Sequence, residues 1–127
     1  MIRRPQSLVE VANWSRDAHE FSLNVQDFLH EYKASPSPVR FAEEPELLAG
    51  RFELGGVADA YLAAVAASLA TDLEMPQPKW ARLPVRFRHE PWFASPGRSM
   101  RACLIIESPG PFRERNLFVS SNALSVA

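Results

Sequence analysis

Apolar side chains recur at alternating spacings of three and four residues near the N-terminus. The stripe consists of Val11, Trp14, Ala18, Phe21, Val25, Phe28 and Tyr32. This spacing predicts an amphipathic helix over residues 6–34, begun by the capping box that Ser7 forms with Glu10. Because so long a helix is unusual in a small domain, a break near Ser15 or Asn24 is one alternative. Another is that part of the stripe packs against a second subunit.

A second helical pattern covers residues 57–75. Its larger apolar side chains are Tyr61, Leu62, Val65, Leu69 and Leu73. The other positions are rich in alanine, which has the highest helix propensity and allows close helix packing. Gly55 and Gly56 precede the pattern, and Pro76 follows it.

The connection between these two helices starts with two prolines in residues 35–38, which stop the first helix. A short helix is expected between Phe41 and Gly50. Pro45 would stand in its first turn, and Gly50 would end it.

The C-terminal third is rich in proline and predicts shorter elements. A basic connection from Lys79 to Pro91 has room for one helical turn. A third helix is expected over residues 96–107, with Ser95 as its N-cap and Pro96 in its first turn. Its expected core side chains are Met100, Cys103, Leu104 and Ile106. Another turn at 111–115 and an extended segment at 117–119 complete this C-terminal helix and motif region, residues 96–127.

Together these patterns predict a mostly α fold: a single compact helical domain over residues 1–127. It would have three main helices, long ordered loops and a short C-terminal extended segment. The length of 127 residues and the apolar fraction of 46% fit one globular domain. The single cysteine excludes a disulfide framework. No apolar run is long enough to cross a bilayer, and no apolar segment follows the basic pair at the N-terminus, so we expect a cytoplasmic protein.

Signatures of catalysis and metal binding are absent from the sequence. The three histidines, at positions 19, 30 and 89, have no metal-ligand spacing, and no phosphate loop or nucleophile elbow is found. Cys103 lies among apolar residues, where a thiol is unreactive. We therefore expect no catalytic residue, no metal and no cofactor, although a small enzyme with a site assembled from distant residues stays an alternative.

The charges are distributed unevenly along the chain. Residues 1–78 contain 6 basic and 12 acidic side chains, whereas residues 79–115 contain 8 basic and 3 acidic ones. These two regions could pair with each other on folding. As an alternative, Arg82, Arg86 and Arg88, which alternate with aromatic side chains, could bind nucleic acid.

The chain from Glu90 onward carries three connected motifs. They read P-W-F-A at 91–94, E-S-P-G-P-F-R-E-R-N-L-F-V at 107–119 and A-L-S at 123–125. This stretch resembles a poorly characterised bacterial family, whose domain often follows an XRE-type helix-turn-helix in regulators or antitoxins. Some of these are encoded near nucleotidyltransferase-like toxins. Little room for a helix-turn-helix precedes Ser7, so the resemblance implies the sensing or partner-binding part alone.

The expected function is therefore a non-enzymatic protein-interaction module, with a regulatory or antitoxin-like role. Its partner would be another protein or a second copy, and no membrane is expected. The candidate partner-binding residues are Trp92, Phe93, Phe112, Arg113, Arg115 and Asn116. In the alternative interpretation, Phe112 and Phe118 fill the core and the arginines pair with acids on the first helix.

Overall fold

A computed structural model describes residues 3–94 and 98–125 of the chain. Its elements, in order, are α1 (Leu8–Trp14), α2 (Ala18–Ala34), α3 (Val39–Ala42), α4 (Gly55–Asp72), the 3-10 helices η1 (Lys79–Arg82) and η2 (Pro84–Arg86), β1 (Trp92–Phe93), α5 (Arg98–Glu107), α6 (Gly110–Glu114) and β2 (Leu117–Phe118). The fold is mostly helical, with two short strands in the described residues, which confirms the expected class.

The N-terminal apolar stripe forms two helices, so the prediction of one helix over 6–34 is wrong and the alternative of a break near Ser15 is confirmed. The Ser7 side chain caps α1, as expected, and accepts a hydrogen bond from the Glu10 N–H. A second cap at Asp17 accepts from the Glu20 N–H at 2.8 Å and starts α2. Between them, Ser15 adopts extended backbone, which lets α1 pack against α2.

The expected short helix between Phe41 and Gly50 is also wrong. Helix α3 ends at Ala42, and the chain then runs without helix to a turn at Gly50, whose φ is 86°. The reason is a competing acceptor: the Asp59 carboxylate accepts hydrogen bonds from the backbone N–H groups of Leu48, at 2.6 Å, and Ala49, at 3.0 Å. Donors that a helix would use internally are thus bound by a side chain of α4.

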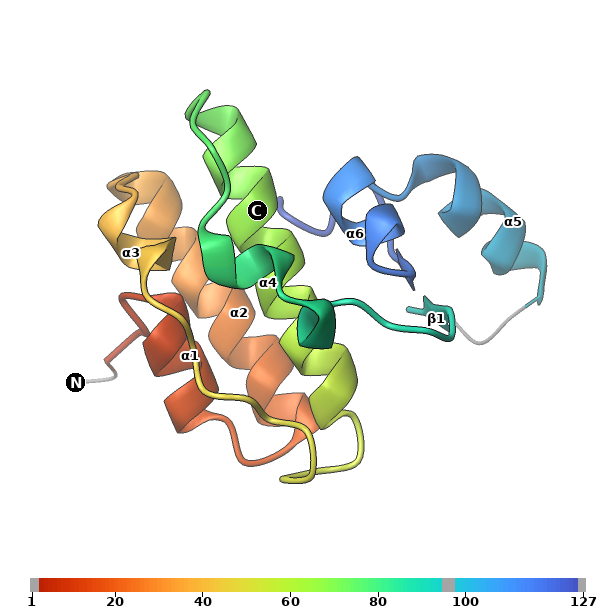
Figure 1. Cartoon of the computed structure of the whole chain (residues 1–127), viewed down its shortest axis with the longest axis horizontal. Helices are drawn as coiled ribbons and strands as arrows, with labels where there is room; N and C mark the ends of the chain where they lie inside the picture. Colours follow the sequence, from red (N-terminus) through yellow and green to blue (C-terminus); the bar gives the residue numbers. More distant parts are fainter. Residues whose placement is uncertain (1–2, 95–97, 126–127) are drawn as a thin grey trace.

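Helix α4 lies at the centre of the molecule, between α2 and the C-terminal elements (Figure 1). Between Gly55 and Ala70, every residue except Gly56 and Tyr61 is buried. A helix that is apolar on all sides belongs in a core, and its alanines let η1, η2 and α6 approach closely. It starts two residues before the predicted position because Gly55 packs against the Leu48 carbonyl, where only a glycine fits.

The C-terminal third closes over α4 through a small parallel sheet. Trp92 is paired with Leu117 and Phe93 with Phe118, so the extended segment expected at 117–119 is confirmed for its first two residues. Helix α6 is the expected turn, and α5 covers the described part of the expected third helix. The predicted cap at Ser95 and Pro96 lies outside the described residues.

No helix in the described part of the chain combines the length and the apolar character that crossing a membrane requires.

Candidate functional site

Arg115, a candidate partner-binding residue, is fully buried. Its guanidinium donates to the carbonyl oxygens of Pro111, at 2.9 Å, and Ala81, at 2.8 Å, and lies 4.5 Å from the ring centroid of Phe87. Burial lowers the pKa of Arg115 to about 10. Phe112 is also fully buried and packs edge-on against Tyr61. Neither side chain is exposed in this fold, so neither presents a surface to a partner.

Arg86, a candidate contact to nucleic acid, is likewise enclosed. It is 0% exposed and donates to the carbonyls of Pro45, at 2.7 Å, and Asp59, at 3.3 Å. Burial lowers its pKa, and the charges of Asp59 and Glu44 oppose that effect. Its guanidinium lies 4.9 Å from the ring centroid of Trp80. The side chain joins the loop before α4 to η2 and is not available to a phosphate.

The other two arginines of the nucleic-acid alternative have different surroundings. Arg82 is exposed and forms an ion pair with Glu114. Arg88 is half-buried, with a guanidinium nitrogen at Gly56, and its backbone is bonded to Arg115. The expectation that the C-terminal arginines pair with acids of the first helix is also wrong for Arg115, because its partners are the carbonyls and amide of the C-terminal half.

The remaining predicted partner residues differ in their exposure. Trp92 is partly buried and packs on the core, and Phe93 stacks on Phe118 with ring centroids 5.0 Å apart. The Asn116 amide donates to the Arg88 carbonyl at 2.9 Å, and its backbone has a φ of 62°. Of the six predicted partner residues, Arg113 alone is exposed.

An apolar surface lies instead on α5, which the sequence had predicted as core. Leu104 is buried there, but Met100 is 47% exposed, Ile105 is 47% exposed and Ile106 is 79% exposed. Cys103 is exposed as well. We call Met100, Cys103, Ile105 and Ile106 the α5 face. Figure 1 shows that α5 lies at the far edge of the molecule, away from α1 and α3. The apolar pattern predicted the helix correctly, yet it does not show whether its apolar side chains are covered by the same chain.

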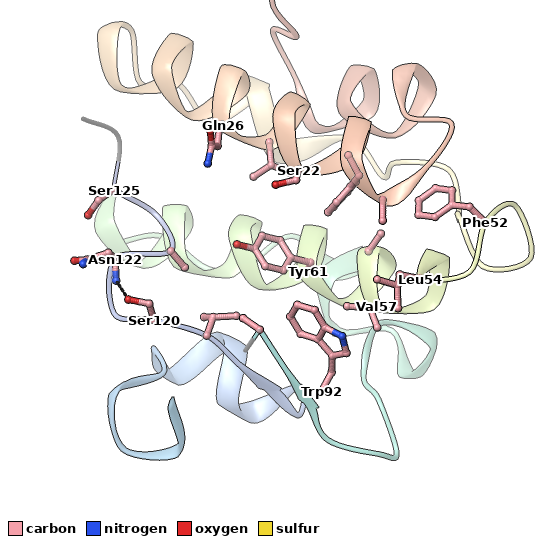
Figure 2. A pocket seen from close by; sticks show the side chains of 17 residues that line it. Ser22, Gln26, Phe52, Leu54, Val57, Tyr61, Trp92, Ser120, Asn122 and Ser125 are labelled. Carbon is pink, nitrogen blue, oxygen red and sulfur yellow. Dashed lines mark hydrogen bonds between the residues drawn. The ribbon is translucent and has the colours of Figure 1, made fainter. Parts of the chain in front are cut away.

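A cleft of about 470 Å³ was not foreseen from the sequence. Its walls come from α2, α4, β1 and the segment 119–125, and Tyr61 lies in its middle (Figure 2). Phe21 and Phe112 both contact the Tyr61 ring edge-on, with centroid distances of 6.0 and 4.9 Å. Burial raises the pKa of the Tyr61 phenol. No single motif could reveal this cleft, because its walls are far apart in the sequence.

Residues 3–94 and 98–125 contain no group of side chains that could bind a metal ion. No three histidine, cysteine or carboxylate side chains there are close enough together to hold an ion.

Comparisons with known proteins return no match: no protein-family model, no curated protein and no solved structure matches this chain. The resemblance of the C-terminal motifs therefore stays a prediction.

Proposed function

We propose that the chain is a non-enzymatic protein-interaction module, and that the α5 face is the surface that its partner covers. The observation that carries this proposal is the exposure of Met100, Ile105 and Ile106 on one short helix. Transfer of exposed apolar side chains from water into contact with a partner is favourable in free energy. An interface of this kind is typical of a helix that inserts into a groove of another protein.

Positive charges on α5 and α6 indicate which charges would surround the groove of the partner. Arg101 is exposed and its guanidinium lies 4.9 Å from the ring centroid of Phe93, and Arg113 is exposed on α6. A partner with an apolar groove and carboxylates at its rim would complement this surface. The burial of Arg86 makes nucleic acid the weaker alternative.

The regulatory role is proposed on the motifs at 91–94 and 107–119. If the domain acts like those it resembles, it binds an enzyme in the cytoplasm and keeps it inactive. A second copy of the chain is the other partner that the α5 face would accept.

One pair of variants tests the proposal. Ile106→Asp places a charge at a position that is 79% exposed, so the fold should tolerate it. Val39→Asp is the matched control, because Val39 is also 79% exposed but lies on α3. Tagged copies of the wild type and both variants would be purified from the host in mild salt, half of each treated with nuclease. We expect a stoichiometric protein partner whose affinity falls at least about tenfold with Ile106→Asp and stays unchanged with Val39→Asp.

Equal recovery of that partner by both variants would contradict a role for the α5 face. Partners lost on nuclease treatment would favour the nucleic-acid alternative, in which affinity falls steeply with salt. Light scattering on the purified chain tests for self-association. A dimer that Ile106→Asp converts to a monomer identifies the partner as a second copy.

A further inference from the structure

The cleft around Tyr61 changes in character along its length. Figure 2 shows Phe52, Leu54 and Val57 at one end with Trp92, and Ser120, Asn122 and Ser125 at the other. Gln26 and Ser22 overhang it from α2, and the Tyr61 hydroxyl points toward the polar end. The site is therefore apolar and aromatic at one end and offers hydrogen-bonding groups at the other.

None of the described residues that line the cleft has a charged side chain. A charged ligand would lose part of its hydration there and gain no opposite charge, so a neutral ligand is favoured. The volume of about 470 Å³ falls within the range of small-molecule sites and is larger than a packing defect.

Small side chains contribute to each wall of the cleft. Four alanines line it: Ala18 on α2, Ala58 on α4, Ala94 directly after β1 and Ala123 in the segment 119–125. Tyr61 is held between Phe21 and Phe112, so its hydroxyl is presented in a defined place. Such a preorganised donor lowers the ordering cost of binding.

We propose that this cleft binds an uncharged amphipathic small molecule, with a planar apolar body against Trp92 and a hydroxyl or carbonyl group toward Tyr61 and Asn122. This site is independent of the α5 face, so it does not rest on the proposed function. A ligand there would contact α2, α4 and the C-terminal segment at once.

Two probes with the same ring system test the charge preference. 2-Naphthol is neutral near pH 7 and carries a hydroxyl, whereas 2-naphthalenesulfonate carries a fixed negative charge. Titration of the full chain with each, followed by amide and indole shifts in two-dimensional NMR, should show binding of 2-naphthol. The shifts should be centred on Trp92, Tyr61 and residues 119–125. 2-Naphthalenesulfonate should bind at least about tenfold more weakly.

Variants locate the site further. Ser22→Trp should weaken 2-naphthol binding at least about tenfold by filling the cleft from its rim, because Ser22 is exposed and lines it. Leu23→Trp is the control: Leu23 is 49% exposed on the same helix and does not line the cleft, so binding should stay within about twofold. Tyr61→Phe removes one hydroxyl and should weaken binding about fivefold.

Binding of both probes with equal affinity would overturn the charge argument. Shifts centred on another part of the chain, or no binding of 2-naphthol up to its solubility, would overturn the site itself. Because the shifts of the wild-type chain locate the probe, the test of the binding site does not depend on how well Ser22→Trp folds. Ile106→Asp should leave 2-naphthol binding unchanged, which separates failure here from failure of the proposed interaction surface.

Discussion

Asp59 and Arg86 join three segments that are distant in the sequence. The Asp59 carboxylate holds the backbone of Leu48 and Ala49, and its Oδ1 lies 3.8 Å from Arg86 Nη1. Arg86 in turn holds Pro45. Both charges are buried, and a buried charge that loses its partner costs several kcal/mol. The pair therefore specifies where the loop before α4 lies.

A double-mutant cycle measures this coupling. Asp59→Asn and Arg86→Met should each lower the free energy of unfolding by about 3 kcal/mol, because each leaves the other side chain buried without its full set of partners. The double variant should lose less than the sum of the two single losses. Urea unfolding of the four proteins checks this result, and strictly additive losses would show that the two side chains act separately.

Among the elements, the start of α4 depends on a close approach of two backbones. A Cβ on Gly55 would lie 2.0 Å from the Leu48 carbonyl oxygen, whereas a Cβ on Gly56 would lie 3.5 Å from Arg88 Nη1. The first distance is far inside van der Waals contact, and the second is ordinary contact. Two neighbouring glycines thus have different roles.

Alanine substitution distinguishes these two glycines. Gly55→Ala should lower the free energy of unfolding by at least about 2 kcal/mol, because the loop at Leu48 must move. Gly56→Ala should be neutral or raise stability by up to about 1 kcal/mol, since alanine favours the helix. Thermal or urea unfolding compares them. Equal losses for both variants would contradict the close approach at Gly55.

Local patterns predicted those elements whose structure depends on the residues within the element itself. The Ser7 cap, the alanine-rich central helix and the extended 117–119 segment follow from propensity and spacing. The break before α2 had a readable signal, because Asp17 and Glu20 repeat the capping spacing of Ser7 and Glu10. The loop at 43–52 had none, since the acceptor of its donors is Asp59.

The site was less predictable than the fold for the same physical reason. Arg113 and Arg115 are two residues apart, yet one is exposed and the other is held by carbonyls of η1 and α6. Basic residues near aromatic ones predict a binding surface only when their side chains reach solvent. For the cleft and the α5 face, long-range packing decides exposure, and the sequence does not show it locally.

For the whole molecule, the buried Tyr32 and the partly buried Tyr61 link stability to alkaline pH. Burial raises the pKa of Tyr61, and burial together with the charge of Asp72 raises that of Tyr32. The folded chain therefore keeps these phenol protons after the unfolded chain releases its own. Stability from this source is complete below the unfolded pKa and is lost as pH rises through the folded one. The lowered pKa of Arg115 acts in the opposite direction over the same range.

Comparison of Tyr61→Phe with the wild type isolates one phenol from these opposing effects. Between about pH 9 and about pH 11, the wild type should lose stability more steeply than the variant, because phenylalanine has no proton to release. Urea unfolding across that range gives both curves. Parallel curves would show that the Tyr61 phenol titrates alike in the folded and unfolded chains.

The burial of most of α4 also constrains how this sequence can diverge. At Ala63, Ala64, Ala66 and Ala67 any larger side chain would push against a neighbouring element, so mutation there is selected against whatever the protein binds. The α5 face has no such internal constraint and changes only as fast as its partner allows. Relatives of this protein should therefore share a strip of small residues in the central helix, while lineages with different partners diverge on α5.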